Sequence, residues 1–138
     1  MPRLSKPSSI RAFGLAVALA SLGAAHAASS DQAISRTLKL LEPTERLEQL
    51  CDYTAMQYIR KNLREYRPDR ALAGAISEPR IKQDTIDAKG GAFRSRKHWY
   101  EMSYSCTADP EHLNVLSFRL NVGDEIPESK WAGYGLWQ

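Results

Sequence analysis

Apolar side chains recur at helical spacing in two segments of the first half of the chain. Ile34, Leu38 and Leu41 are three or four residues apart, which predicts a short helix. Pro43 ends that pattern and suits the first turn of a second helix, expected from about residue 43 to about residue 65. The apolar stripe of the second helix consists of Leu47, Leu50, Cys51, Thr54, Ala55 and Tyr58, extended by Ile59 and Leu63. This helix is therefore expected to cover a core with one face.

Alternation of apolar and polar positions predicts strands in the second half of the chain. We expect strands at residues 85–88, about 93–107 and 112–122, with turns at Gly90-Gly91 and Asp109-Pro110. The apolar rows of the two longer strands are Tyr100, Met102, Tyr104 and Cys106, and Leu116, Phe118, Leu120 and Val122. These two rows should meet beneath the second helix, while the opposite face of the sheet meets water.

The predicted fold class is α+β, with two N-terminal helices packed on a three- to four-stranded antiparallel sheet. Residues 71–83 leave the number of strands open, because they suit either a short strand or a turn of helix. Arg94, Arg96 and His98 share parity with the apolar row of the long strand, which a straight strand does not allow. We expect a bulge or a sharp twist near Lys97 to resolve this conflict. The tail from Ile126 should lie across an open edge or end of the sheet.

The first 27 residues have the pattern of a secretory signal peptide. A basic start without acids precedes an apolar stretch at residues 12–25, and Ala25-His26-Ala27 follows as a cleavage motif. The basic residues are Arg3, Lys6 and Arg11. The alternative is an uncleaved membrane anchor, but a spanning helix needs about 20 apolar residues. We therefore predict export and cleavage before Ala28.

Cleavage would leave a flexible segment at residues 28–33 and a single α+β domain at residues 34–138, periplasmic or secreted. All three charges in the first 27 residues are basic, so the net charge falls from +3 to zero. A chain without a global positive charge is not expected to bind nucleic acid. No transmembrane span is expected after cleavage.

Both cysteines, Cys51 and Cys106, follow the predicted cleavage site. An even count in an exported protein indicates a disulfide, which here would join the second helix to the long strand. The alternatives are two buried free thiols, or a metal site that also uses His98 and His112. The metal alternative lacks the closely paired ligands typical of structural zinc sites, so no metal and no other cofactor is predicted.

Residues 90–100 hold the densest group of candidate binding side chains. Cations and an aromatic ring in this segment could grip an anionic group while the ring stacks on a sugar, since arginine suits bidentate contacts with anions. The candidate residues are Arg94, Arg96, His98 and Trp99. The alternative is an edge strand whose charges oppose sheet-to-sheet aggregation. The partner implied is an envelope protein or an anionic envelope component.

A second basic run lies at the end of the second helix and just beyond it. It consists of Arg60, Lys61, Arg64, Arg67 and Arg70. It could contact a partner or a membrane surface. The alternative is that it complements the helix dipole, because acids gather at the start of the same helix. Those acids are Glu42, Glu45, Glu48 and Asp52.

Support for catalysis is weak. His98 and His112 are the two histidines beyond the cleavage site, and either could act as a general base. No nucleophile elbow, phosphate loop or metal signature accompanies them. The sequence therefore assigns no catalytic residue and leaves open whether the protein is an enzyme.

Several segments together resemble a known family. They are residues 47–52, residues 91–96, the stretch from Trp99-Tyr100 through Cys106, and Ile126-Pro127 with Trp131. These segments resemble small exported alphaproteobacterial proteins grouped as domain of unknown function nine-thirty, over about residues 38–137. The resemblance implies an exported single domain, and no catalytic residue follows from it.

The leading hypothesis is a non-enzymatic envelope module that binds another protein or an envelope component. A second is a small-ligand pocket or a hydrolytic site between helix and sheet, using His98 or His112. A third is a purely structural domain whose aromatic residues all belong to the core.

Overall fold

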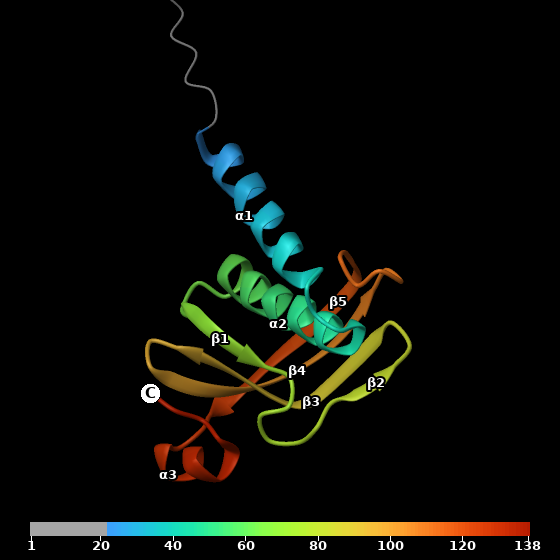
Figure 1. Ribbon diagram of the computed structural model, residues 1–138. Helices are drawn as coiled ribbons and strands as arrows, with labels where there is room; N and C mark the ends of the chain where they lie inside the picture. Colours follow the sequence, from blue (N-terminus) through green and yellow to red (C-terminus); the bar gives the residue numbers. More distant parts are fainter. Residues whose placement is uncertain (1–21) are drawn as a thin grey trace, which may run out of the picture.

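The protein combines helices with a five-stranded antiparallel sheet (Figure 1). The computed structural model describes residues 22–138, so most of the predicted signal peptide lies outside the described residues. The elements in chain order are α1 (Leu22–Leu38), α2 (Pro43–Asn62), β1 (Pro68–Leu72), β2 (Arg80–Lys82), β3 (Thr85–Ser95), β4 (His98–Ala108), β5 (Val115–Glu125), α3 (Glu128–Trp131) and a short 3-10 helix, Ala132–Tyr134. The α+β class is confirmed, and the sheet has five strands where three to four were expected.

The sheet has the order β1-β3-β4-β5, and the short β2 also pairs with β3. Helix α2 lies across one face of it, whereas α1 leads away from the sheet (Figure 1). In the described range 22–138, no helix is both long and apolar enough to cross a membrane.

Helix α2 follows the predicted stripe. Pro43 occupies its first turn, where a missing backbone N–H leaves no intrahelical hydrogen bond unmade. Side chains four residues apart on α2 are fully buried, which places one continuous face on the sheet. They are Leu47, Cys51, Ala55 and Ile59.

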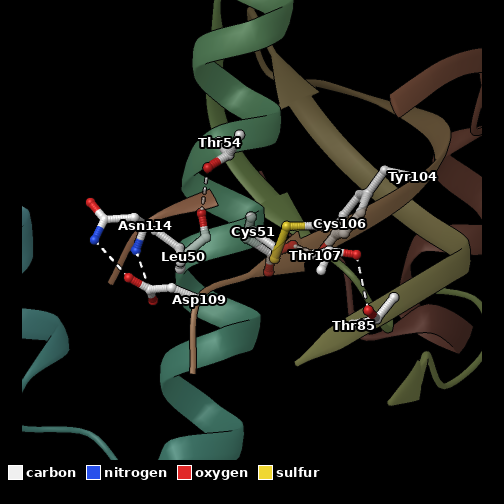
Figure 2. Close-up of a disulfide and its surroundings, with 10 residues drawn as sticks. Leu50, Cys51, Thr54, Thr85, Tyr104, Cys106, Thr107, Asp109 and Asn114 are labelled. Atoms are coloured by element: carbon white, nitrogen blue, oxygen red, sulfur yellow. Dashed lines mark hydrogen bonds between the residues drawn. A yellow bond between two sulfur atoms is a disulfide. The ribbon is translucent and has the colours of Figure 1, made fainter. Parts of the chain in front are cut away.

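A disulfide joins Cys51 of α2 to Cys106 of β4, as predicted. The two Cα atoms are 6.1 Å apart, and both residues are fully buried. Figure 2 shows the bond crossing from the helix to the strand beneath it. The covalent bond therefore ties the two main layers of the core together.

The predicted turn at Gly90-Gly91 is wrong. Both glycines lie inside β3, and the chain reverses instead at Arg96 and Lys97, between Ser95 and its partner His98. Arg96 and Lys97 have φ angles of 51° and 69°, the left-handed conformation that a two-residue hairpin turn demands.

The expected long strand is in fact two strands, β3 and β4, joined by this turn. This explains why Arg94, Arg96 and His98 did not fit the alternation of a single strand. Phe93 pairs with Tyr100, and Arg94 pairs with Trp99. Phe93 belongs to the core under α2, whereas Trp99 belongs to a second core on the opposite face. The sharp change of direction expected near Lys97 is thus a complete reversal.

Gly90 lets the loop after β1 approach the backbone of β3 closely, and it does not form a turn. The β3–β4 register shifts between Ala88 and Gly91, and the loop after β1 docks there through a hydrogen bond from the Ile76 N–H to the Gly90 carbonyl, 2.7 Å. A Cβ atom on Gly90 would lie 2.6 Å from the backbone nitrogen of Ser77. Because the obstacle includes backbone, a side chain at this position would displace the loop.

We predict that Gly90→Ala lowers the free energy of unfolding by about 2–3 kcal/mol, since it overpacks a backbone contact. Gly133→Ala is the matched control, because a Cβ atom there meets nothing within 4 Å. Urea denaturation should show the control within about 0.5 kcal/mol of wild type. Equal stability of both variants would contradict the close-approach interpretation.

The two predicted apolar rows meet in the register Met102–Val122, Tyr104–Leu120 and Cys106–Phe118. Leu116 was expected to join the same row, and this is wrong: it is 67% exposed. The β4–β5 register shifts between Thr107 and Ala108. The shift breaks the strict alternation that the sequence pattern assumed.

The C-terminal tail builds a second core on the sheet face away from α2. Its buried residues are Ala92, Trp99, Ile126, Trp131 and Leu136. The Trp131 indole donates to the Ile126 carbonyl, 2.9 Å, and the Trp99 indole donates to the Trp137 carbonyl, 2.7 Å. The tail thus packs over one end of the sheet, consistent with the expectation for it.

Candidate functional site

Arg94 and Trp99, two of the four predicted binding residues, support one another. The Arg94 guanidinium donates from Nε and an Nη to the two carboxylate oxygens of Asp69, at 2.9 and 3.1 Å. Its Cζ atom lies 5.9 Å from the centre of the Trp99 ring, which is fully buried. The hydrogen bond from Arg94 holds the pKa of Asp69 below its usual value. Trp99 therefore offers no exposed ring for stacking on a ligand.

Arg96 and His98, the other two, lie at the exposed tip of the β3–β4 hairpin together with Lys97. His98 Nδ1 is 2.7 Å from Glu125 Oε1. In the described range 22–138, no ion pair engages Arg96 or Lys97. The free positive charge of the predicted segment is thus confined to the turn.

The basic run at the end of α2 lies beside this tip. The Arg67 backbone N–H donates to Ser95 Oγ, 2.7 Å, and Pro68 pairs with Ser95 across the β1–β3 ladder. Arg60 donates to the Pro68 carbonyl from the last turn of the helix. Two basic segments that are separate in sequence therefore meet at one end of the molecule.

We call this surface the basic cap. It consists of Arg60, Lys61, Arg64, Arg67, Arg96 and Lys97. All six side chains are exposed, and no ion pair within residues 22–138 involves any of them. Arg70, also part of the predicted run, instead lines the groove between α1, α2 and β1.

An aromatic cluster supports the basic cap from below. The Tyr66 ring meets Phe93 edge-on at 5.1 Å between centroids, and it meets Tyr100 at 5.0 Å. Phe93 and Tyr100 stack at 5.4 Å. These contacts pack the loop after α2 against the base of the hairpin, so the same cluster supports both basic segments.

His112 links the start of α2 to the turn before β3. It is 7% exposed, with Nδ1 2.8 Å from the Pro43 carbonyl and Nε2 2.9 Å from Asp84 Oδ1. Both ring nitrogens are thus engaged, between the start of α2 and the turn before β3. His98 begins β4 and His112 follows its end, so the two histidines share no site. Among residues 22–138, no cluster of three or more metal-ligating side chains occurs.

Asp52 of α2 is a buried acid. From the sequence it was expected to be one of the acids that complement the helix dipole. It is 5% exposed, and it accepts hydrogen bonds from the Tyr104 hydroxyl, 2.8 Å, and the Ala73 N–H, 3.3 Å. Burial raises the pKa of the Asp52 carboxyl from 3.8 to about 7, against the opposing effect of these hydrogen bonds. Burial also raises the pKa of the Tyr104 hydroxyl.

A signal for Asp52 was present in the sequence. Asp52 directly follows Cys51 and precedes Ala55 by three positions, which places it on the flank of the apolar stripe. Asp52 lines a groove between α1, α2 and β1 with a volume of about 310 Å³. Its partner could not be anticipated, because Tyr104 is 52 residues away in sequence.

Comparison with known proteins places these features in a family. No curated protein and no solved structure matches the chain. The family described as Domain of Unknown Function (DUF930) matches residues 38–136, from the last residue of α1 to the buried Leu136 of the tail. This match contains α2, all five strands, both cysteines and the basic cap, and the chain therefore belongs to the DUF930 family.

Proposed function

We propose that this protein is an exported binding module whose basic cap holds an anionic component of the cell envelope. The observation that carries the proposal is the meeting of six exposed cations from two segments of the chain, none of which forms an ion pair within residues 22–138. Without residues 1–27 the chain has no net charge, so the basic cap is a local concentration of charge. Such a patch attracts phosphate or carboxylate groups by the electrostatic field at its surface.

The backbone of the hairpin tip supports the same proposal. Turns with two left-handed residues favour Asn-Gly, because most side chains are strained in that conformation. Here Arg96 and Lys97 occupy those positions, at φ angles of 51° and 69°. Strained residues that are retained in a fold often serve function. A function that needs positive charge at the hairpin tip would explain why two cations occupy this turn.

Export is supported by the basic start, the apolar stretch and the cleavage motif of residues 1–27. The disulfide between Cys51 and Cys106 agrees with an oxidising compartment such as the periplasm or the exterior. A hydrolytic role for His98 or His112 has less support, because His98 is exposed beside Glu125 and both nitrogens of His112 are engaged by the Pro43 carbonyl and Asp84.

The double variant Arg96→Asn/Lys97→Gly tests the proposal. It replaces the two strained cations with the preferred turn, so we expect a hairpin as stable as the original or stabler by up to about 1 kcal/mol. Binding to vesicles of phosphatidylglycerol and phosphatidylcholine should weaken about 30-fold, at about 1 kcal/mol per cation. Co-sedimentation at low and high salt measures this, and wild-type binding should fall as salt rises.

The matched control is Lys89→Gln/Arg119→Gln, which removes two cations from the sheet face opposite α2. It should leave vesicle binding close to wild type. Equal weakening in both double variants would mean that binding follows net charge rather than the basic cap. Unchanged binding in the hairpin variant would contradict the proposal, and loss of stability cannot explain a weakening.

A further inference from the structure

The groove beside Asp52, which we call the Asp52 groove, is separate from the basic cap. It lies between α1, α2 and β1 and has a volume of about 310 Å³, within the range of small-ligand pockets. Apolar and polar side chains both line it. The apolar ones include Ile34, Leu38, Leu41, Met56, Leu72 and Trp137, and Arg70 lines it as a cation. The Trp137 side chain, 47% exposed, lies at the groove although the rest of the tail packs on the opposite sheet face.

The buried polar group of this groove is the Asp52 carboxyl. Each of its oxygens accepts one hydrogen bond, from Tyr104 or from Ala73, and an ionised carboxylate can accept about four. Asp52 lines the groove, and acceptor capacity is left over on its carboxylate. Asp69 also lines the groove, but its carboxylate already forms a two-point ion pair with Arg94, which compensates its charge.

We propose that the Asp52 groove binds a small organic cation, in which an ammonium group meets the Asp52 carboxylate and an apolar body lies along the walls. This site goes beyond the proposed function and does not depend on it. Charge complementarity selects the occupant: an ammonium donor uses the spare acceptor sites of Asp52. Asp52 is 5% exposed, and burial strengthens an ion pair relative to bulk solvent.

The charged groups around Asp52 determine how this binding depends on pH. Glu48 on its own helix disfavours ionisation of Asp52, and the Tyr104 hydroxyl from β4 stabilises the ionised form. On β1, Arg70 lines the groove beside the Asp69–Arg94 pair, and α1 contributes no charged side chain to the lining. With the Asp52 pKa near 7, an ammonium ligand should bind more tightly as pH rises from 6 to 8.

The probes are n-hexylamine, protonated at these pH values, and the neutral 1-hexanol of matched length. Isothermal titration of the purified protein at pH 8 should show at least tenfold tighter binding of hexylammonium than of hexanol. The preference should shrink at pH 6, while hexanol binding stays constant. In Asp52→Asn the two probes should bind alike. The amide can donate to Tyr104 and accept from Ala73, so this variant preserves both hydrogen bonds.

A second variant tests the groove without changing Asp52. Met56→Trp fills the groove and should abolish binding of both probes, whereas Leu116→Gln, at an exposed apolar position on β5, should change neither. Equal affinity of the two probes for the wild type, or a preference that survives in Asp52→Asn, would overturn the proposal. Tighter binding of hexanoate than of hexylammonium would also overturn it. The Arg96→Asn/Lys97→Gly variant should bind hexylammonium normally, which separates this site from the basic cap.

Discussion

Replacing Cys51 and Cys106 together by alanine is expected to lower the free energy of unfolding by about 3–4 kcal/mol. The disulfide closes a loop between residues 55 apart in sequence, and the chain-entropy model gives a loop of this length about 4 kcal/mol. A domain of this size has a total stability of about 5–15 kcal/mol, so the loss would be a large share of it. Alanine is chosen over serine because both sites are fully buried, where an unpaired hydroxyl adds its own penalty.

Urea denaturation of the oxidised wild type and of the double variant measures this difference. Dithiothreitol should lower the denaturation midpoint of the wild type towards that of the variant and leave the variant unchanged. If the double variant unfolded within about 1 kcal/mol of the oxidised protein, the bond would not constrain the unfolded chain as the loop-entropy argument requires. A single Cys51→Ala variant leaves a free thiol at Cys106 and makes a poorer comparison.

Helix α2 and the disulfide were predictable because their signals are local or nearly so. A buried position every four residues identifies the helix and also places Cys51 on its inner face. The alternation around Cys106 places that cysteine on the same side of the sheet as its partner. Only two cysteines exist, so the pairing had one possible solution inside the molecule.

The hairpin was mispredicted because two glycines resemble a turn in sequence. What distinguishes Gly90 is its contact with Ser77, a residue of a loop that the sequence pattern left unassigned. Arg96 and Lys97 carry no turn signal, since neither residue type favours the left-handed conformation. Tertiary contacts decided both positions, and a local pattern could not reveal them.

The sequence revealed the two basic segments of the candidate site but not that the fold brings them together. Both basic segments were recognised, but their meeting depends on the pairing of Pro68 with Ser95, which brings the end of α2 to the hairpin tip. Trp99 was expected at a binding surface, and its burial follows from the C-terminal tail folding back over the sheet. Asp52 was treated as one acid among several because its burial depends on β1 and β4, which lie far from it in sequence.

Asp52 should make the protein less stable as pH rises from about 4 to about 7. Its pKa is about 7 in the folded protein and close to 3.8 in an unfolded chain, so the folded state holds a proton that the unfolded state releases. The contribution of Asp52 to stability is therefore full below about pH 4 and is lost progressively up to about pH 7. At about 1.4 kcal/mol per pKa unit, the free energy of unfolding is lower by about 4 kcal/mol once the pH is above 7.

The variant Asp52→Asn isolates this effect, because an amide keeps the hydrogen-bonding positions and cannot ionise. At pH 8 we expect the variant to be about 2–4 kcal/mol more stable than wild type, and at pH 4 the difference should be small. Asp109→Asn is the control of opposite sign, since hydrogen bonds from Asn114 and Leu113 lower the pKa of Asp109. That variant should lose stability relative to wild type at pH 8 and lose less at pH 3. Urea denaturation from pH 3 to pH 8 measures both variants. If Asp52→Asn followed the wild-type pH dependence, the assignment would be contradicted, since the buried carboxyl would then not be the group that titrates.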